Sequence, residues 1–183
     1  MINFLTSPLP SSLSVCGKDY PINTDFKVWI QIENIVSDKG LSSADKLIKI
    51  FSLVFISPDI PPSIDKAIDA LCNFFAPFAH RKGGGGDSIT PTFSFSYDGG
   101  LIYAAFLSQY GIDLSSARLH WWRFLALFYG LDNCKFTEVV KIRSTDLSAV
   151  KDPDQKRFIR NLKRLYKIPN SSLDISSEIS KIF

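Results

Sequence analysis

The segment Trp121–Tyr129 constrains the fold most, because nearly all of its residues are apolar or aromatic. A helix that is exposed on one side keeps a polar stripe, and in the run WWRFLALFY only Arg123 is charged. A membrane span needs about 20 consecutive apolar residues, and this run is shorter and follows His120. The sequence therefore predicts a helix that a protein core covers on most faces.

A second apolar run, Leu101–Leu107, precedes this helix, and the two runs are separated by a polar connection with turn and capping residues. Asp98 is suited to cap the first helix and Gly111 to end it. Asp113, Ser115 and Ser116 offer caps for the second helix. The pattern predicts a helical hairpin as the core of a C-terminal lobe, with these core residues: Tyr103, Phe106, Trp121, Trp122, Phe124 and Phe128.

Short strand-compatible runs on either side of Gly17 predict a β-hairpin near the N-terminus. Capping residues then precede three helical segments: residues 25–38, residues 44–55 after Ser42 or Ser43, and a helix that Pro61 and Pro62 open. We expect a mainly α protein of two small lobes with a short N-terminal β-hairpin. The predicted parts are residues 1–80 (hairpin and three helices), 81–96 (connector), 97–168 (C-terminal helical lobe) and 169–183 (tail).

The run Gly83–Gly86 indicates a flexible connector, because consecutive glycines are costly to order and make no side-chain contacts. A phosphate-binding loop is the alternative. That loop requires a Lys directly after its last Gly, whereas Lys82 precedes this run and Asp87 follows it. The acidic residue would repel phosphate, so we predict no nucleotide site.

The chain offers few residues for catalysis or metal binding. Its two histidines, His80 and His120, do not stand at metal-ligand spacing from Cys or carboxylates. Cys72 lies in an apolar helical stripe and His120 beside two tryptophans, so we interpret both as core residues. We predict no catalytic residues, no metal site and no cofactor, hence no enzyme. Three scattered cysteines and an N-terminus unlike a signal peptide indicate the reducing cytoplasm.

The helix expected from Pro153 to Lys167 is strongly basic and amphipathic. Its apolar stripe comprises Phe158, Ile159, Leu162, Leu165 and Tyr166. Asp154 is its only acidic residue, and its basic residues are the predicted partner-binding set: Lys156, Arg157, Arg160, Lys163, Arg164 and Lys167. Such a face binds phosphate backbones or an acidic protein helix, or is simply solvated. The net charge of the whole chain, +3, does not by itself imply a polyanionic partner.

Four segments carry a resemblance to a known family: DFKVWIQIE, LIYAAFLSQYGIDL followed by LHWWRFLALFYGL, KFTEVVKIRSTDLS, and KDPDQKRFIRNLKRLYKI. They resemble the phage gene-product-fifteen family, which is found in tail-gene clusters of siphophages and prophages. The two adjacent tryptophans after the YGIDL turn are the most specific feature. The Gly83–Gly86 connector lies where the family varies in length.

The resemblance implies a tail-assembly chaperone in the bacterial host cytoplasm, and it brings no catalytic residues with it. The expected partners are the tape-measure protein and the tail-tube protein, with self-association as a further contact and no membrane contact. One alternative is a structural component of the phage tail or connector. A nucleic-acid-binding module that uses residues 153–167 is the second alternative, and the less favoured one.

Overall fold

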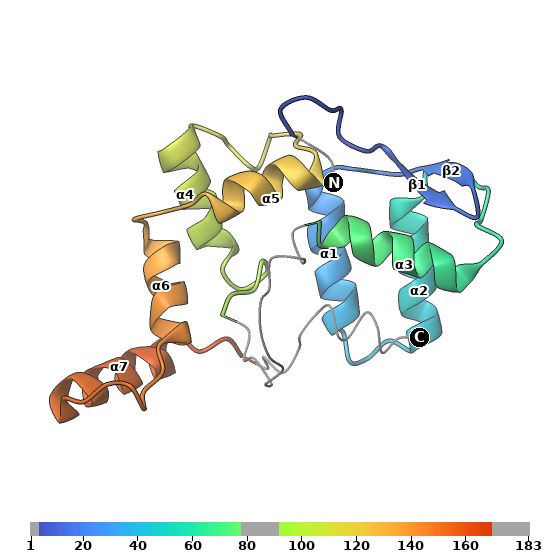
Figure 1. The fold of residues 1–183 in the computed structure, drawn as a ribbon. Helices are drawn as coiled ribbons and strands as arrows, with labels where there is room; N and C mark the ends of the chain where they lie inside the picture. Colours follow the sequence, from blue (N-terminus) through green and yellow to red (C-terminus); the bar gives the residue numbers. More distant parts are fainter. Residues whose placement is uncertain (1–3, 78–91, 170–183) are drawn as a thin grey trace. The chain divides into compact units, whose positions relative to one another are not determined.

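The computed structural model describes residues 4–77 and 92–169 (Figure 1). These ranges contain seven helices and one two-stranded antiparallel sheet, so the expectation of a mainly α protein with an N-terminal hairpin is confirmed. Most of the predicted connector and nearly all of the predicted tail lie outside the described residues. The described chain divides into two compact units: unit 1 (residues 4–77 and 118–126) and unit 2 (residues 92–117 and 127–169).

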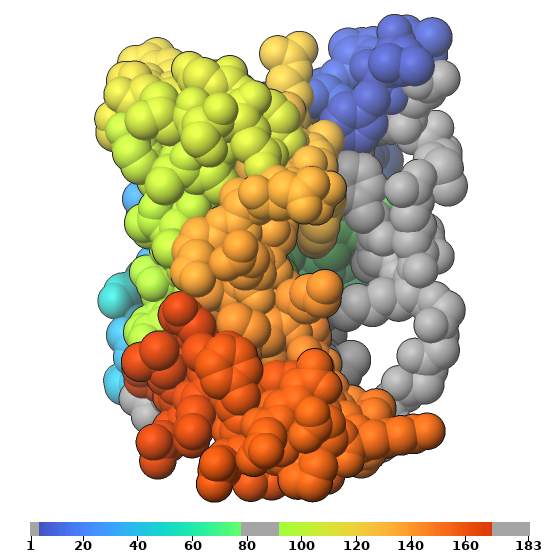
Figure 2. Space-filling view, turned by 90° about the vertical axis from the view of Figure 1, so that its left-hand side faces the viewer, coloured from blue at the N-terminus to red at the C-terminus, as the bar shows by residue number. Residues whose placement is uncertain are grey.

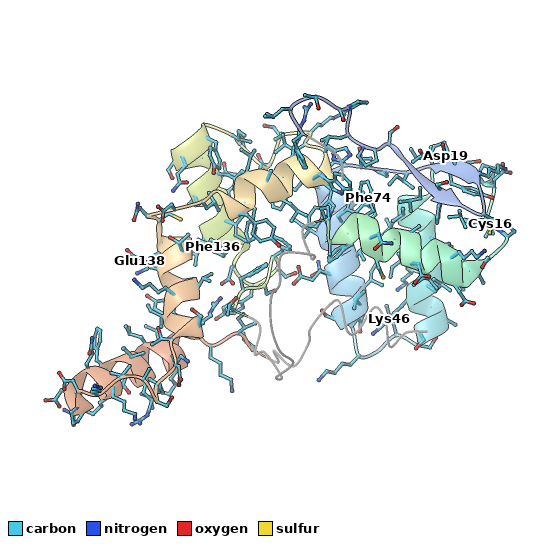
Figure 3. All side chains as sticks on the ribbon, in the orientation of Figure 1. Cys16, Asp19, Lys46, Phe74, Phe136 and Glu138 are labelled. Carbon is cyan, nitrogen blue, oxygen red and sulfur yellow. The ribbon has the colours of Figure 1, made fainter. Side chains whose placement is uncertain are left out.

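Unit 1 begins with the predicted hairpin of β1 (Ser12–Val15) and β2 (Lys18–Pro21), paired from Ser12 opposite Pro21 to Val15 opposite Lys18. Its turn places Cys16, labelled in Figure 3, and Gly17 at φ 53° and 79°. Glycine adopts such positive φ values without steric cost. The hairpin packs against α3 through Val15, Tyr20 and Ala67.

Three helices follow the hairpin: α1 (Phe26–Ser37), α2 (Ser43–Val54) and α3 (Ile64–Phe75). The predicted caps are present on the first two, where Asp25 accepts from the Lys27 N–H and Ser42 from the Asp45 N–H. The third helix begins later than predicted. Ser63 caps it by accepting from the Lys66 N–H, so Pro61 and Pro62 precede the helix rather than open it.

Aromatic side chains fill the core of unit 1. The indole of Trp29 lies 4.5 Å from the ring of Phe74 and 6.3 Å from that of Trp121, centroid to centroid. Phe26 stacks on Phe124 at 4.7 Å. Residues 118–126, which the sequence assigned to the C-terminal lobe, thus belong with unit 1.

Backbone hydrogen bonds also join residues 118–126 to the rest of unit 1. The Phe26 N–H donates to the Leu119 carbonyl, and the Trp121 N–H donates to the Thr24 carbonyl at 2.7 Å. The segment before α1 is therefore bonded to the segment before α5 (Trp121–Tyr129). The division of the chain falls inside α5, because residues 127–129 group with unit 2.

Unit 2 contains α4 (Gly99–Tyr110), α6 (Lys135–Ser144), α7 (Pro153–Leu165) and the end of α5. Gly111 ends α4 at φ 65°, as predicted. Phe128 of α5 packs among three aromatic rings of unit 2, those of Phe93, Phe95 and Phe136. Phe136 and Glu138 leave α6 on opposite sides, one buried and one exposed (Figure 3).

The caps predicted for α5 are wrong. His120, and not Asp113, Ser115 or Ser116, caps α5, because its Nδ1 accepts from the Trp122 N–H at 3.1 Å. Cys134 stands at the N-cap of α6, where the Thr137 hydroxyl accepts from its N–H and donates to its carbonyl. At both helices the residue directly before the first helical position takes part in satisfying the end groups.

Candidate functional site

The basic helix α7 presents exposed side chains that are suited to binding a partner. The Asp152 carboxylate caps it by accepting from the backbone N–H groups of Asp154 and Gln155, and Pro153 occupies its first turn. Within α7, which the structure describes in full, no residue is buried. In the space-filling view α7 and residues 166–169, orange to red, lie below α6 on the face toward the viewer (Figure 2).

The six predicted partner-binding residues do not share one environment. Arg157, Arg160, Arg164 and Lys167 are exposed, whereas Lys156 and Lys163 are half-buried. Only one ion pair involving them is seen in the described chain, a 3.5 Å contact between Arg157 and Asp154 that is open to solvent. Exposed pairs of this kind bind weakly, so the guanidinium groups remain available to a partner.

The apolar stripe predicted for α7 is only partly covered. Ile159, Leu162 and Tyr166 are half-buried, but Phe158 is 61% exposed and Leu165 is 68% exposed. Phe158, Leu162 and Leu165 follow the spacing i, i+4, i+7, which places them in line on a helix. We call these three residues the α7 apolar row.

Two arginines run alongside this row. Arg157 and Arg164 each precede an exposed member of the row by one residue, about 100° around the helix. We call them the arginine row. The ring of Tyr166, directly after α7, contacts α6, since the Lys135 ammonium lies 5.6 Å from its centroid. The open flank of α7 thus combines exposed apolar side chains with positive charge.

A buried ion pair, Arg143–Asp98, anchors the end of α7 within unit 2. The Arg143 guanidinium donates to both Asp98 carboxylate oxygens at 2.6 and 2.9 Å, and the two side chains are 7% and 1% exposed. It also donates to the carbonyls of Thr92 and of Tyr166, directly after α7. One guanidinium therefore joins α4, α6 and the chain that leaves α7.

This pair corrects the role predicted for Asp98. Asp98 stands at the N-cap position of α4, but its side chain makes no capping hydrogen bond there. The carboxylate accepts from Arg143 and from the Ser94 N–H. Sequence reasoning missed Arg143 because its partner lies 45 residues away. The only available signal was an arginine in the last turn of an otherwise amphipathic helix.

His120 is held by its neighbours. Its Nε2 donates to the Pro10 carbonyl at 2.9 Å while Nδ1 accepts from the Trp122 N–H, an arrangement that requires the neutral ring. Burial lowers the pKa of His120, and the nearby Arg123 lowers it further. The interaction with Pro10 acts in the opposite direction. This histidine is a neutral helix cap, and His80 lies outside the described residues.

The cysteines are the other candidate nucleophiles. All three are free thiols; Cys16 is exposed, while Cys72 and Cys134 are half-buried. Burial raises the pKa of the Cys72 thiol, and the charge of Asp69 adds to the effect. A raised pKa disfavours the nucleophilic thiolate. Cys72 instead lines a small apolar cavity of unit 1.

That cavity has a volume of about 20 Å³ and wholly apolar walls contributed by α1, α2 and α3. Its lining residues are Trp29, Ile32, Leu47, Ile50, Ile68, Leu71, Cys72 and Phe75. Ligand pockets usually hold about 300–1,000 Å³. The cavity is therefore a packing defect too small for a cofactor.

The paired tryptophans are both tied into unit 1. The indole N–H of Trp121 donates to the Phe75 carbonyl at 2.9 Å, and that of Trp122 to the Phe74 carbonyl at 2.8 Å. Trp121 is buried, as are three more of the predicted core residues, Phe106, Phe124 and Phe128; Tyr103 and Trp122 are half-buried. Phe74 of α3, labelled in Figure 3, packs its ring 5.3 Å from that of Trp122, centroid to centroid.

Two further observations on the described residues concern metal sites and membrane-spanning helices. Among residues 4–77 and 92–169, no group of three or more His, Cys, Asp or Glu side chains is placed to hold a metal ion. None of the helices in these ranges has the length and apolar character to cross a bilayer.

Comparison with known proteins identifies the family. No curated protein and no solved structure matches the chain. The family model described as Bacteriophage Gp15 protein matches residues 5–168, which span both units and end just after α7. The resemblance of the YGIDL, LHWWRFLALFYGL and KDPDQKRFIRNLKRLYKI segments is thereby confirmed. The chain belongs to the Bacteriophage Gp15 protein family.

Proposed function

We propose that this protein is a tail-assembly chaperone that binds the tape-measure protein in the host cytoplasm and helps to recruit tail-tube subunits. Membership of the Bacteriophage Gp15 protein family supports a phage-related structural or assembly role. One observation supports the narrower proposal, namely the exposed Phe158 and Leu165 beside the arginine row. Exposed apolar side chains that are grouped on one helix face are typical of protein-binding surfaces.

The chemistry of this surface indicates which kind of helix in the tape-measure protein would bind it. An amphipathic helix binds by placing its apolar residues, spaced i, i+3, i+4 and i+7, against an apolar row on its partner. Acidic residues at the edge of such a client helix would meet Arg157 and Arg164. A long helical tape measure offers many such sites, and contacts that are weak singly add up along its length.

Co-expression of the chain with the tape-measure protein of the same phage tests the proposal. The expected result is co-purification and a larger soluble fraction of the tape measure. Phe158→Asp combined with Leu165→Asp should abolish both effects. Ile60→Asp is the matched control, because Ile60 is 73% exposed but lies before α3, outside unit 2. Absence of co-purification and of any gain in solubility would count against the proposal.

Charge reversal distinguishes client binding by the arginine row from attraction to the overall positive charge of the chain. Arg157→Glu with Arg164→Glu changes the arginine row, whereas Lys39→Glu with Lys49→Glu makes the same change of charge at exposed lysines of unit 1. We expect the first pair to weaken client binding much more than the second. Equal loss in both would mean that only the total charge matters.

The exposed arginines also favour a second candidate, a nucleic-acid-binding module. Binding to phosphates weakens steeply with salt, and it would collapse when Arg157, Arg160 and Arg164 are all changed to Glu. It would persist in Phe158→Asp with Leu165→Asp, unlike client binding. Mass spectrometry of purified particles distinguishes a chaperone from a retained tail component, which would be present in stoichiometric amount.

A further inference from the structure

The two edges of the β1–β2 sheet differ in what covers them. The chain after α2 follows the outer edge of β2, where the Ile56 N–H donates to the Pro21 carbonyl at 3.2 Å. Farther along the same edge, the Lys18 ammonium pairs with the Asp59 carboxylate, also at 3.2 Å. Pro58, which has no N–H, lies between Ile56 and Asp59 in this segment. Proline, charged side chains and a covering loop all protect a sheet edge against addition of another strand, so the β2 edge is protected.

The outer edge of β1 is different. Within β1, which reads Ser-Leu-Ser-Val, no residue is charged and none is proline. The Ile22 N–H donates to the Ser11 carbonyl, which fixes the alternation of bonded and non-bonded pairs along the β1–β2 ladder. Ser12 and Ser14 stand at the non-bonded positions, so their N–H and C=O groups point away from β2. In the part of the chain that the structure describes, neither serine makes a hydrogen bond on that outer side.

The side chains of β1 show which kind of segment fits beside it. Leu13 and Val15 are buried, and Val15 packs with Ala67 of α3. Ser14 is exposed, since successive side chains of a strand point to opposite faces. A strand added next to β1 would continue both faces. The edge therefore suits an extended, uncharged segment in which apolar and polar residues alternate.

We propose that the outer edge of β1 binds an extended segment of the tail-tube subunit as a third strand. Strand addition of this kind derives its affinity from main-chain hydrogen bonds, here to the N–H and C=O groups of Ser12 and Ser14. Charge separates this partner from the tape measure, because α7 is strongly basic whereas β1 is uncharged. The identity of the partner rests on the proposed function, but the open edge does not.

A second copy of the chain fits this edge less well than a partner segment does. β1 has four residues, and pairing two such strands would bury far less than the roughly 1,200 Å² of a stable interface. The short edge predicts weak, reversible binding. Such binding suits the delivery of a subunit and not a permanent dimer.

Amide hydrogen exchange of the full-length chain, followed by NMR with and without the tail-tube protein of the same phage, tests the proposal. In the free chain, the N–H groups of Ser12 and Ser14 should exchange faster than those of Leu13 and Val15, which point toward β2. Adding the tube protein should slow exchange at both serines by at least about tenfold. Exchange at Leu13 and Val15 should change much less, because their N–H groups are already bonded.

Proline substitutions test the role of the edge. Ser14→Pro removes an outward N–H but no bond of the β1–β2 ladder, and it should weaken binding of the tube protein by about tenfold. Asp19→Pro is the matched control, because Asp19, labelled in Figure 3, stands opposite Ser14 and its N–H points to the β2 edge. It should leave binding almost unchanged. Slow exchange of Leu13 and Val15 in each variant shows that the hairpin is intact.

A third variant keeps the test valid if proline disturbs the hairpin. Ser14→Lys keeps the N–H and adds the charge by which natural sheet edges avoid a further strand, so it should weaken binding as well. Three results would overturn the proposal: exchange of Ser12 and Ser14 that the tube protein does not change, equal weakening by Ser14→Pro and Asp19→Pro, or slow exchange of both serines in the free chain. Slow exchange that disappears on dilution would indicate a second copy of the chain.

Tape-measure binding is measured separately, so the two proposals fail in different ways. Ser14→Pro should leave tape-measure binding unchanged, and Phe158→Asp with Leu165→Asp should leave the effect of the tube protein on Ser14 unchanged. Tape-measure binding without any effect of the tube protein on Ser14 would overturn the assignment of the β1 edge alone. Protection of Ser14 by the tube protein without tape-measure binding would overturn the proposed function alone.

Discussion

At the scale of single residues, the Arg143–Asp98 pair has the largest expected effect on stability. Both charges are almost fully buried, and the guanidinium satisfies two carbonyls as well as the carboxylate. Removing one member of such a pair leaves the other charge buried without compensation. Whatever its net contribution to the free energy of unfolding, the pair therefore fixes how α4, α6 and the end of α7 are arranged.

Arg143→Met should lower the free energy of unfolding of unit 2 by about 3–5 kcal/mol, because Asp98 then stays buried without its partner. Urea unfolding followed by circular dichroism measures the change. Lys135→Met, which breaks the exposed pair with Glu138, is the control and should have a far smaller effect. A loss for Arg143→Met no larger than that of the control would contradict this interpretation.

His120 should make stability depend on pH. Burial holds its pKa in the folded chain below the ordinary value near 6.5. The folded state then prefers the neutral ring, so the contribution is complete above about pH 6.5 and is lost as the pH falls through the lower, folded-state pKa. Protonation would also remove the Nδ1 acceptor that caps α5.

We expect the urea midpoint of the wild type to fall more between pH 7.5 and pH 5, roughly the range in which an unfolded histidine takes up its proton, than that of His120→Asn. Asparagine keeps an N-cap acceptor but does not titrate in this range. Tryptophan fluorescence follows the transition in unit 1. Parallel curves for the two proteins would show that His120 contributes nothing to the pH dependence.

At the scale of elements, α7 depends more on local signals than the other helices do. It has no buried residue, and helices of fewer than about 12–15 residues are marginal in water without tertiary packing. Its stability therefore rests on the Asp152 cap, on Pro153 in the first turn and on Lys163 and Arg164 in the last turn, which complement the helix dipole.

Asp152→Ala should increase fraying of the first turns of α7, since loss of an N-cap costs about 1 kcal/mol. Carbon chemical shifts of residues 153–158 measure the helix content. Ser42→Ala, which removes the corresponding cap of α2, is the comparison. This substitution should change the helix content of α2 less, because α2 is also held by Ile50 and Val54, which are buried within unit 1. Equal loss of helix in both variants would contradict the prediction.

At the scale of the whole molecule, the two units have separate aromatic cores. All three tryptophans, Trp29, Trp121 and Trp122, lie in unit 1. Unit 2 is built around phenylalanines, among them Phe93, Phe128 and Phe136. Tryptophan fluorescence thus reports on unit 1 alone, while circular dichroism reports on the helices of both units.

Arg143→Met should therefore separate the two signals. All of the contacts of Arg143 described above lie in unit 2, so part of the helical signal should be lost at lower urea than in the wild type, while the fluorescence midpoint stays in place. Coincident transitions that both shift would instead show that the described chain unfolds as one cooperative body.

Local chemistry in the sequence determined most of the secondary structure. Caps such as Asp25, Ser42 and Asp152 act on N–H groups two or three residues away, and Gly17 and Gly111 adopt the positive φ values that their turns require. These interactions are decided within one turn of helix, so they can be read from neighbouring residues. The start of α7 at Pro153 was predictable for the same reason, because the Asp152 cap directly precedes it.

Tertiary structure alone decided which faces are covered. Asp98 looked like a helix cap until Arg143, 45 residues along the chain, was placed beside it. Phe158 and Leu165 belong to the predicted apolar stripe of α7, and the structure leaves both of them exposed. Residues 118–126 joined unit 1 through bonds to the segment before α1. Periodicity shows that a helix has an apolar face, but whether that face is buried depends on elements that are distant in the sequence.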